Sequence, residues 1–312
     1  MSITLVNKRK HIISLTDLSA QETLEIINRG IEYANGAVEL GHQLKGQVVG
    51  IYFTKTSTRT RTSFTTAALR LGAQVISYGP NDLQVNTGET MNDTLQVLSR
   101  MLDGLVIRTA GSPDVLKTFA KQERMSIVNA MTQDEHPTQA LADLTTMKRY
   151  FGELAGLHIV YSGEGNNTAT ALALALAKFP NIHLSFFTPP GYGLNLEILS
   201  YAQQEGQKRN TFIKEFHDLK FLPSNADIIY TTRWQTTGTR KTDPNWRSIF
   251  EPFAVTDQLL SKYPKAIFMH DLPAHRGDEV EASVIDGAQS IVFEQAENKA
   301  YSGKAILEWC ME

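Results

Sequence analysis

The alternation of short apolar runs with longer helical stretches is the feature that most constrains how this chain folds. Strand-like runs lie at residues 48–53, 73–78, 104–108, 126–129, 157–162, 183–188, 226–231 and 266–270, and helical stretches separate them. Strands joined by crossover helices pair in parallel, so the sequence predicts an α/β fold with mainly parallel sheets flanked by helices. A length of 312 residues predicts two such domains.

A polar, glycine-containing turn at Phe151–Gly156 follows a long predicted helix and marks the expected domain boundary. It gives a first domain over residues 1–150 and a second over residues 151–312, each with a comparable set of strands. Residues 295–311 are predicted to form a last helix that folds back across the first domain.

Composition limits the class of protein. The chain has 30 Lys+Arg against 33 Asp+Glu, a balance that argues against a nucleic-acid binder. No apolar run approaches the roughly 18 residues of a membrane span, and Met1–Ile13 lacks the apolar core of a secretory signal. The single cysteine, Cys310, can form neither an internal disulfide nor a thiolate metal site. We therefore expect a reduced, cytoplasmic protein.

Ligands of open α/β sheets bind beyond the carboxyl ends of the strands, and polar segments follow four predicted strands. The first, Ser57-Thr58-Arg59-Thr60-Arg61, offers hydroxyls, guanidinium groups and the N–H groups of a helix start. Such a combination suits a phosphate, and the alternative is a helix cap with solvated arginines. The segment is not a P-loop, because GxxxxGK[ST] is absent from the chain.

The other three polar segments are less specific by themselves. Arg108 follows an apolar run, and taken by itself it would be interpreted as a charged residue on the surface. His136 precedes Pro137, and a proline in the first helical turn is an ordinary helix start. The loop His270–Glu279 fits a ligand site and a solvated surface loop equally well.

Two further patterns argue weakly for a cofactor or a metal. The segment Gly163–Asn167 suggests a dinucleotide-binding turn, but Thr168 replaces the third glycine of that fingerprint. The spacing of His270, Asp271 and His275 matches no familiar zinc pattern. We expect neither a cofactor nor a metal.

Together these segments resemble the aspartate/ornithine carbamoyltransferase family over nearly the whole chain. Ser57–Arg61 is similar to the family's carbamoyl-phosphate motif, and His136–Gln139 to its second motif. Phe268–Gly277 resembles the HCLP loop of the ornithine branch, and Ala296–Asn298 its C-terminal helix. The resemblance implies an active site in a cleft between two domains. It also implies a homotrimer in which a neighbour donates the loop around residues 84–89.

The resemblance also implies a reaction and a set of donor residues. An amine attacks the carbonyl carbon of carbamoyl phosphate, a tetrahedral oxyanion forms, and phosphate leaves without a covalent enzyme intermediate. Arg108 and His136 would stabilise the charge that develops on the carbonyl oxygen, and Gln139 and the Leu272 carbonyl would orient the carbamoyl amide. The residues implied for carbamoyl phosphate are Ser57, Thr58, Arg59, Thr60, Arg108, His136, Gln139, Leu272 and Lys299, the last in place of the ornithine branch's arginine.

The acceptor half departs from the family. Thr232 stands where the ornithine branch has the Asp of DxWxSMG that holds the amino-acid ammonium, and Thr236-Thr237 replaces Ser-Met. Thr232-Arg233-Trp234-Gln235 also resembles the TRxQ segment of the aspartate branch, so Arg233 and Gln235 could grip a carboxylate. The aspartate branch's loop lysine, however, is Thr87 here. Asn166 and Asn167 match positions that contact the amino acid in the ornithine branch.

Asp271 replaces the loop cysteine of the ornithine branch. A carboxylate there could hold an ammonium or accept its proton, and the alternative is that it only caps the turn. We therefore expect a carbamoyltransferase whose acceptor is an amino-acid-like amine other than plain ornithine or aspartate. A divergent ornithine carbamoyltransferase and a non-catalytic homologue that binds carbamoyl phosphate are the alternatives. The sequence leaves open the acceptor, the pathway and the regulation.

Overall fold

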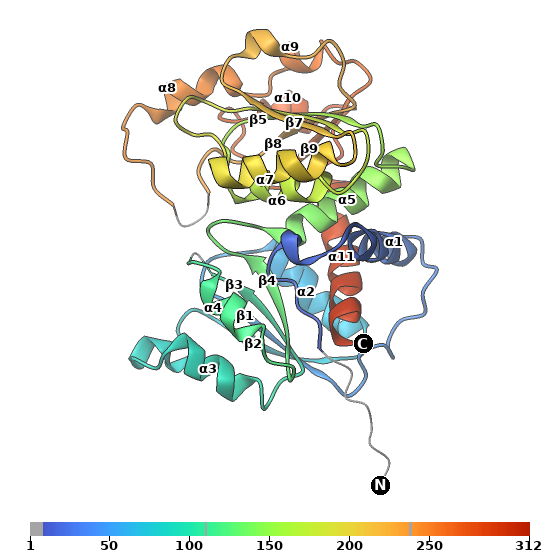
Figure 1. Cartoon of the computed structure of the whole chain (residues 1–312), viewed down its shortest axis with the longest axis vertical. Coiled ribbons are helices and arrows are strands. Elements are labelled where there is room, and N and C mark those ends of the chain that lie inside the picture. The colour runs from blue at the N-terminus through green and yellow to red at the C-terminus, as the bar shows by residue number, and fades with distance from the viewer. Residues whose placement is uncertain (1–8, 110, 237–238) are drawn as a thin grey trace. The chain divides into compact units, whose positions relative to one another are not determined.

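The computed structural model describes residues 9–109, 111–236 and 239–312. The chain forms two compact units (Figure 1). The first holds the chain up to Thr138 together with Lys299–Glu312, and the second holds Gln139–Asn298. The predicted domain division between residues 150 and 151 would place helix α5 (Pro137–Phe151) in the first domain except for its last residue, and it stays a prediction.

The first unit is built on a four-stranded sheet in the order β2-β1-β3-β4. All three pairings are parallel, as the crossover pattern predicts. Its core cluster includes apolar residues of one face of the sheet, such as the paired Leu105 and Ile127, together with Leu95 of a covering helix. The elements are η1 (Leu15–Asp17), α1 (Ala20–Ala34), β1 (Val48–Phe53), α2 (Arg59–Arg70), β2 (Gln74–Tyr78), η2 (Gln84–Thr87), α3 (Met91–Leu98), β3 (Gly104–Arg108), α4 (Asp114–Phe119) and β4 (Ser126–Met131).

The second unit has a five-stranded parallel sheet in the order β7-β6-β5-β8-β9. Helix α6 is buried along its whole length, because its alanines and leucines leave no polar face for solvent. After α5, the elements are β5 (His158–Ser162), α6 (Asn167–Leu176), β6 (His183–Phe187), α7 (Leu196–Gln207), β7 (Phe212–Phe216), η3 (Leu219–Phe221), β8 (Ile228–Thr231), α8 (Trp246–Phe250), η4 (Glu251–Phe253), α9 (Asp257–Leu260), β9 (Ile267–His270), α10 (Ala282–Ile285) and α11 (Val292–Met311).

The last helix, α11, returns to the first unit, which confirms the prediction for the C-terminal segment. A Cβ at Gly303 would stand 3.5 Å from the Ala67 Cβ of α2, an ordinary contact distance, so the two helices lie directly against each other. Glu308 of α11 accepts hydrogen bonds from Arg29 (2.5 Å) and Tyr33 (2.7 Å) of α1. In Figure 1, α11 lies beside α1 and α2.

The strand orders place polar segments where ligands bind in open α/β sheets. In the first sheet the order reverses between β1 and β3, and in the second between β5 and β8. Successive crossovers diverge at such a switch point and leave room beyond the strand ends. Ser57–Arg61 follows β1 and Arg108 ends β3, whereas Gly163–Asn167 follows β5 and Thr232 follows β8. Among the helices of the described residues, none has the length and apolar character that crossing a membrane requires.

Candidate active site

The segment after β1 leaves its hydroxyls available to a ligand. Helix α2 begins at Arg59, and Thr58 occupies the N-cap position without a cap hydrogen bond from its side chain. The Thr58 side chain is exposed, Ser57 is half-buried and Thr60 is buried at the first turn. Because the Thr58 hydroxyl does not cap the helix, the simple helix-cap interpretation does not account for it. Arg61 donates to Ser77 Oγ of β2 at 2.8 Å.

Arg108 is the last residue of β3 and is buried, with 8% of its surface exposed. The register with β4 shifts beside it, so that Ile107 faces Asn129 while Arg108 faces Met131. Met131 has φ of +148°, in a region that side chains rarely adopt. The shift falls at the carboxyl edge of the sheet, where bulges commonly redirect side chains near binding sites.

His136 follows β4 and is buried, with 4% exposure. Burial lowers its pKa well below the usual value, and the positive charges of Lys299 and Arg108 lower it further. The imidazole is therefore neutral at physiological pH, and it can donate through one ring nitrogen. Thr138 Oγ1 lies 3.4 Å from Nδ1. His136 can thus act as a neutral hydrogen-bond donor, while Arg108 and Lys299 supply positive charge.

Glu135, the residue before His136, is a feature that the sequence analysis missed. Its buried carboxylate accepts hydrogen bonds from Ser14 Oγ (2.6 Å) and the Leu15 N–H (2.7 Å). Burial raises the pKa of Glu135 to about 7. The carboxylate ties the segment that carries His136 to the N-terminal part of the first unit.

Gln139 opens the second unit and is buried. Its Nε2 donates to Asp143 Oδ1 at 2.9 Å, which fixes the orientation of the amide. Asp143, which the sequence analysis also missed, accepts further bonds from Gln295 Nε2 (2.7 Å) and the Tyr230 hydroxyl (2.9 Å). Burial raises the pKa of Asp143 to about 6.

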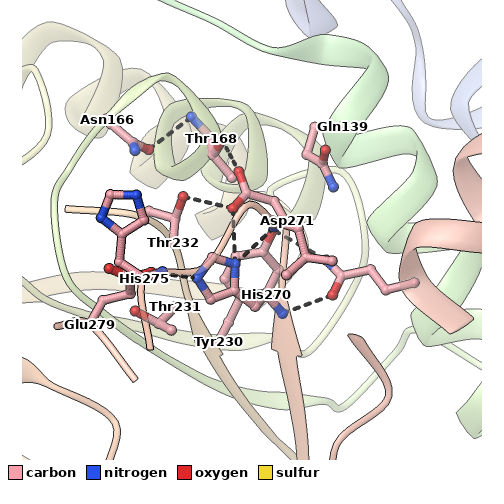
Figure 2. Close-up of polar contacts among 12 residues, drawn as sticks. Gln139, Asn166, Thr168, Tyr230, Thr231, Thr232, His270, Asp271, His275 and Glu279 are labelled. Carbon is pink, nitrogen blue, oxygen red and sulfur yellow. Dashed lines mark hydrogen bonds and ion pairs between the residues drawn. The ribbon is translucent and has the colours of Figure 1, made fainter. Parts of the chain in front are cut away.

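Asp271 lies at the centre of the residues that the sequence predicts for the acceptor (Figure 2). The hydroxyls of Thr168 and Thr232 donate to its two carboxylate oxygens, each at 2.8 Å, and His270 Nδ1 lies 3.4 Å from Oδ1. Burial opposes ionisation, but the hydrogen bonds from these three residues outweigh it and lower the pKa of Asp271. These partners come from β9, the start of α6 and the end of β8. The Asp271 carboxylate is therefore fixed by hydrogen bonds from other elements, and its role is not limited to capping its own turn.

The rest of the loop after β9 folds around buried groups. His270 Nε2 lies 3.3 Å from Glu279 Oε1, and the same carboxylate accepts the N–H of His275. The His270 N–H donates to Gln295 Oε1 at 2.8 Å. Leu272 follows Asp271 with φ of +53°. A solvated surface loop would not bury Glu279 to 1% exposure, so the loop is a structured part of the site.

The remaining residues predicted for the acceptor lie on the loops that follow β5 and β8. Asn166 caps α6 by accepting the N–H groups of Thr168 (3.0 Å) and Ala169 (3.2 Å), and Asn167 is buried beside it. Arg233 is half-buried, and its Nε has no hydrogen-bond partner among the described residues. Gln235 donates to the Thr239 carbonyl at 2.7 Å.

Thr236 Oγ1 lies 3.4 Å from Glu164 Oε2. Thr237 and Gly238 belong to the segment after Thr232 that differs from the family's pattern, and they lie outside the described residues. Across the described ranges no group of three or more His, Cys, Asp or Glu side chains is arranged to hold a metal ion.

These features define a class of protein: a two-unit α/β protein in which hydroxyl and cationic side chains follow the strands of one parallel sheet and a carboxylate-centred polar cluster follows those of the other. Comparisons with known proteins identify the family. A family model described as "Aspartate/ornithine carbamoyltransferase, carbamoyl-P binding domain" matches residues 10–149, and its "Asp/Orn binding domain" partner matches residues 155–310.

Similar proteins cover nearly the full length. An ornithine carbamoyltransferase of Nostoc punctiforme is 40% identical over 96% of this chain and 96% of its own. One from Oceanobacillus iheyensis is 42% identical over 85% of this chain and 82% of its own. The solved ornithine carbamoyltransferase of Pyrococcus furiosus is 33% identical with a TM-score of 0.90, covering 99% of each chain. The chain therefore belongs to the aspartate/ornithine carbamoyltransferase family, and it is a carbamoyltransferase.

Proposed function

We propose that this enzyme transfers the carbamoyl group of carbamoyl phosphate to an amino group of an amino-acid-like acceptor other than plain ornithine, giving a ureido product and phosphate. The contact between Thr232 and Asp271 carries the proposal. The ornithine branch has its carboxylate at the position of Thr232 and a cysteine at the position of Asp271. Here the carboxylate stands on residue 271, 2.8 Å from the Thr232 hydroxyl, so it approaches the acceptor from another strand.

The donor is bound by the first unit. Ser57, Thr58, Arg59 and Thr60 hold the phosphate with hydroxyls, a guanidinium and helix-start N–H groups. Arg108 and Lys299 add positive charge, and neutral His136 donates a hydrogen bond to the carbonyl oxygen as it becomes an oxyanion. The second unit orients the carbamoyl amide through the fixed amide of Gln139 and the carbonyl of Leu272.

The acceptor must reach the carbonyl carbon as a free amine. A primary ammonium with an ordinary pKa of about 10 first loses a proton, and the ionised Asp271 is placed to hold that ammonium and to accept the proton. The nitrogen lone pair then forms the C–N bond, the C–O bond to phosphate breaks, and the surplus proton on the nitrogen leaves with the phosphate as hydrogen phosphate. Asp271 precedes Leu272 in the chain, so its carboxylate stands next to the carbonyl assigned to the donor.

Arg233 provides the second contact for an acceptor that carries a carboxylate. Its Nε is buried and has no hydrogen-bond partner in the part of the chain that the structure describes, so the guanidinium retains a donor for an anion. Asn166, Asn167, Gln235 and Thr236 complete the proposed acceptor residues. A shorter or modified diamino acid fits a cation-binding Asp271 and an anion-binding Arg233.

Ornithine itself is the second candidate acceptor. Relatives that are 36–42% identical to this chain are named ornithine carbamoyltransferases. The ornithine branch has one carboxylate at position 232, and this chain has one in contact with residue 232, on Asp271. On this alternative Asp271 receives the ammonium in place of the missing aspartate, and the product is citrulline. A non-catalytic homologue is disfavoured by the presence of Arg59, Arg108 and His136 together.

We also propose that the enzyme is a homotrimer, as the family resemblance implies, and that it works in the cytoplasm, as its single cysteine predicts. The loop expected to reach a neighbour contains η2 (Gln84–Thr87), and Gln84, Asn86, Thr87 and Gly88 are all exposed on the single chain. Light scattering of the purified enzyme at a mass near three chains would support the assembly, and a monomer would contradict it.

Phosphate release from carbamoyl phosphate, measured with and without added amines, separates these functions. An enzyme gives amine-dependent release matched one to one by ureido product. Release that does not respond to any amine, or no release above the spontaneous rate, would contradict carbamoyl transfer.

A further inference from the structure

Lys241 lies at the far end of the segment that follows β8, and its ammonium is buried. Only 5% of its side chain is exposed. Its Nζ forms an ion pair with Glu164 Oε1. It also lies over three rings, 4.6 Å from the centroid of Tyr192, 4.7 Å from Phe250 and 5.4 Å from Trp246.

This arrangement is an ammonium-binding site. A carboxylate combined with several aromatic faces is the chemistry by which proteins recognise alkylammonium ligands. Burying a lysine is costly unless it is paired, and the cage and Glu164 together offset that cost for Lys241. The rings are themselves fixed, because Trp246 and Phe250 pack with Trp234 in one buried cluster.

The cage joins two segments that carry proposed acceptor residues. Glu164 belongs to the loop between β5 and α6, two residues before Asn166, and it also contacts Thr236 Oγ1 at 3.4 Å. The Gly165 N–H donates to the Tyr192 carbonyl at 2.8 Å. A Cβ at Gly165 would stand 2.3 Å from the backbone of Gly193, so this loop has little freedom to move. The loop therefore offers a rigid anchor.

We propose that Lys241 is a positioning residue for the acceptor: its ammonium, caged by Tyr192, Trp246 and Phe250 and paired with Glu164, fixes the segment after β8 against the loop after β5. The segment begins with Thr232 and Arg233, so the cage sets acceptor affinity without touching the acceptor. This inference rests on the proposed function only in assigning these two segments to the acceptor.

Lys241→Met tests the role because it keeps the length of the side chain and removes the charge. We expect the KM for the best amine acceptor to rise about tenfold or more, in line with the loss of a desolvated cation–π and ion-pair contact. The KM for carbamoyl phosphate stays unchanged. Lys208→Met is the matched control, because Lys208 pairs with Glu205 on the surface and should alter neither constant.

Chemical rescue separates positioning from general damage. In Lys241→Ala, tetramethylammonium can refill the cage, because it is close in size to the propylammonium group that the substitution removes, and it cannot be carbamoylated because it has no N–H. We expect it to restore acceptor KM in this variant and to leave the wild-type enzyme unchanged. Its binding also changes the fluorescence of Trp234 and Trp246, which reports the cage even if no amine in the panel proves to be an acceptor.

Three results would overturn the proposal: an acceptor KM within twofold of wild type in Lys241→Met, an equal rise in both KM values, or no rescue and no fluorescence change in Lys241→Ala. If the lysine variants do not fold, Glu164→Gln removes the same ion pair with little change of shape. For Glu164→Gln, too, a rise in the acceptor KM alone supports the proposal, and an unchanged acceptor KM or an equal rise in both KM values overturns it.

Discussion

Replacing Asp271 by Asn removes the charge at the centre of the acceptor site and keeps its shape. In the wild-type enzyme the carboxylate is ionised, because hydrogen bonds from Thr168, Thr232 and His270 outweigh burial and lower its pKa. An asparagine can still accept from one threonine hydroxyl and donate to the other. The change should therefore alter the binding of a cation much more than it alters the fold.

The size of the effect follows from what the carboxylate does. A hydrogen bond to a charged group contributes about 1.5–3 kcal/mol, which corresponds to a loss of about 10- to 150-fold in kcat/KM for the amine. If Asp271 also accepts the proton of the attacking ammonium, kcat falls as well, by the roughly 100- to 10,000-fold typical of general-base catalysis. The KM for carbamoyl phosphate should not change, since Arg59, Arg108 and His136 are untouched.

Steady-state kinetics with each substrate varied in turn measures these constants. Asp278→Asn is the matched control, because Asp278 lies in the same loop but contacts Arg247 at the surface, 3.4 Å away. A raised KM for the amine with unchanged kcat would assign Asp271 to binding alone. If Asp271→Asn behaves like Asp278→Asn, the carboxylate does not contact the acceptor and the reasoning fails.

Three further predictions concern other parts of the molecule. Arg59→Ala should abolish turnover while the circular dichroism spectrum stays native, because Arg59 supplies charge to the phosphate; near-normal rates would refute the donor assignment. Burial raises the pKa of Glu135 to about 7 from an ordinary 4.5, so the folded state binds the proton more tightly than the unfolded chain. This contribution to stability is fully present below about pH 4.5 and is lost as the pH rises through 7, a change of about 3 kcal/mol. Urea midpoints from pH 5 to 8 should fall more steeply in the wild type than in Glu135→Gln, which keeps only the contribution of buried Asp143; parallel profiles would contradict the prediction. Tyr230→Phe removes a donor to buried Asp143 and should destabilise the protein by about 1–3 kcal/mol, whereas Tyr150→Phe, at an exposed tyrosine, should not; equal midpoints for the two variants would refute this role.

The strands could be predicted closely, because each apolar run is long enough to cross a buried sheet. The run at residues 48–53 is β1 without any shift, and 104–108 is β3. The exception is β7 (Phe212–Phe216), an edge strand that carries Lys214 and Glu215 and lacks a continuous apolar run. Helix α2 begins at Arg59, inside the polar segment Ser57–Arg61, and its polar first turn gives no apolar pattern from which that start could be predicted.

The candidate site could be predicted only where its residues are close together in the sequence. Ser57–Arg61 and His136–Gln139 each form a short motif, so their chemistry could be predicted from the sequence without knowledge of the fold. The contact between Thr232 and Asp271 joins residues 39 positions apart, and it exists because β8 and β9 are neighbours in the sheet. The Glu135–Ser14 and Glu164–Lys241 pairs depend on tertiary contacts in the same way. Their charges looked like ordinary surface residues in the sequence.

The identity of the acceptor is the central claim, and ureido-product formation across a panel of amines tests it most directly. The panel holds ornithine, lysine, putrescine, aspartate, 2,4-diaminobutyrate and 2,3-diaminopropionate, each compared by kcat/KM at saturating carbamoyl phosphate. The rearranged carboxylate at Asp271 predicts that an amine other than ornithine, most simply a shorter diamino acid, gives the highest value. A clear preference for ornithine would contradict the claim and would show that Asp271 only replaces the aspartate missing at residue 232.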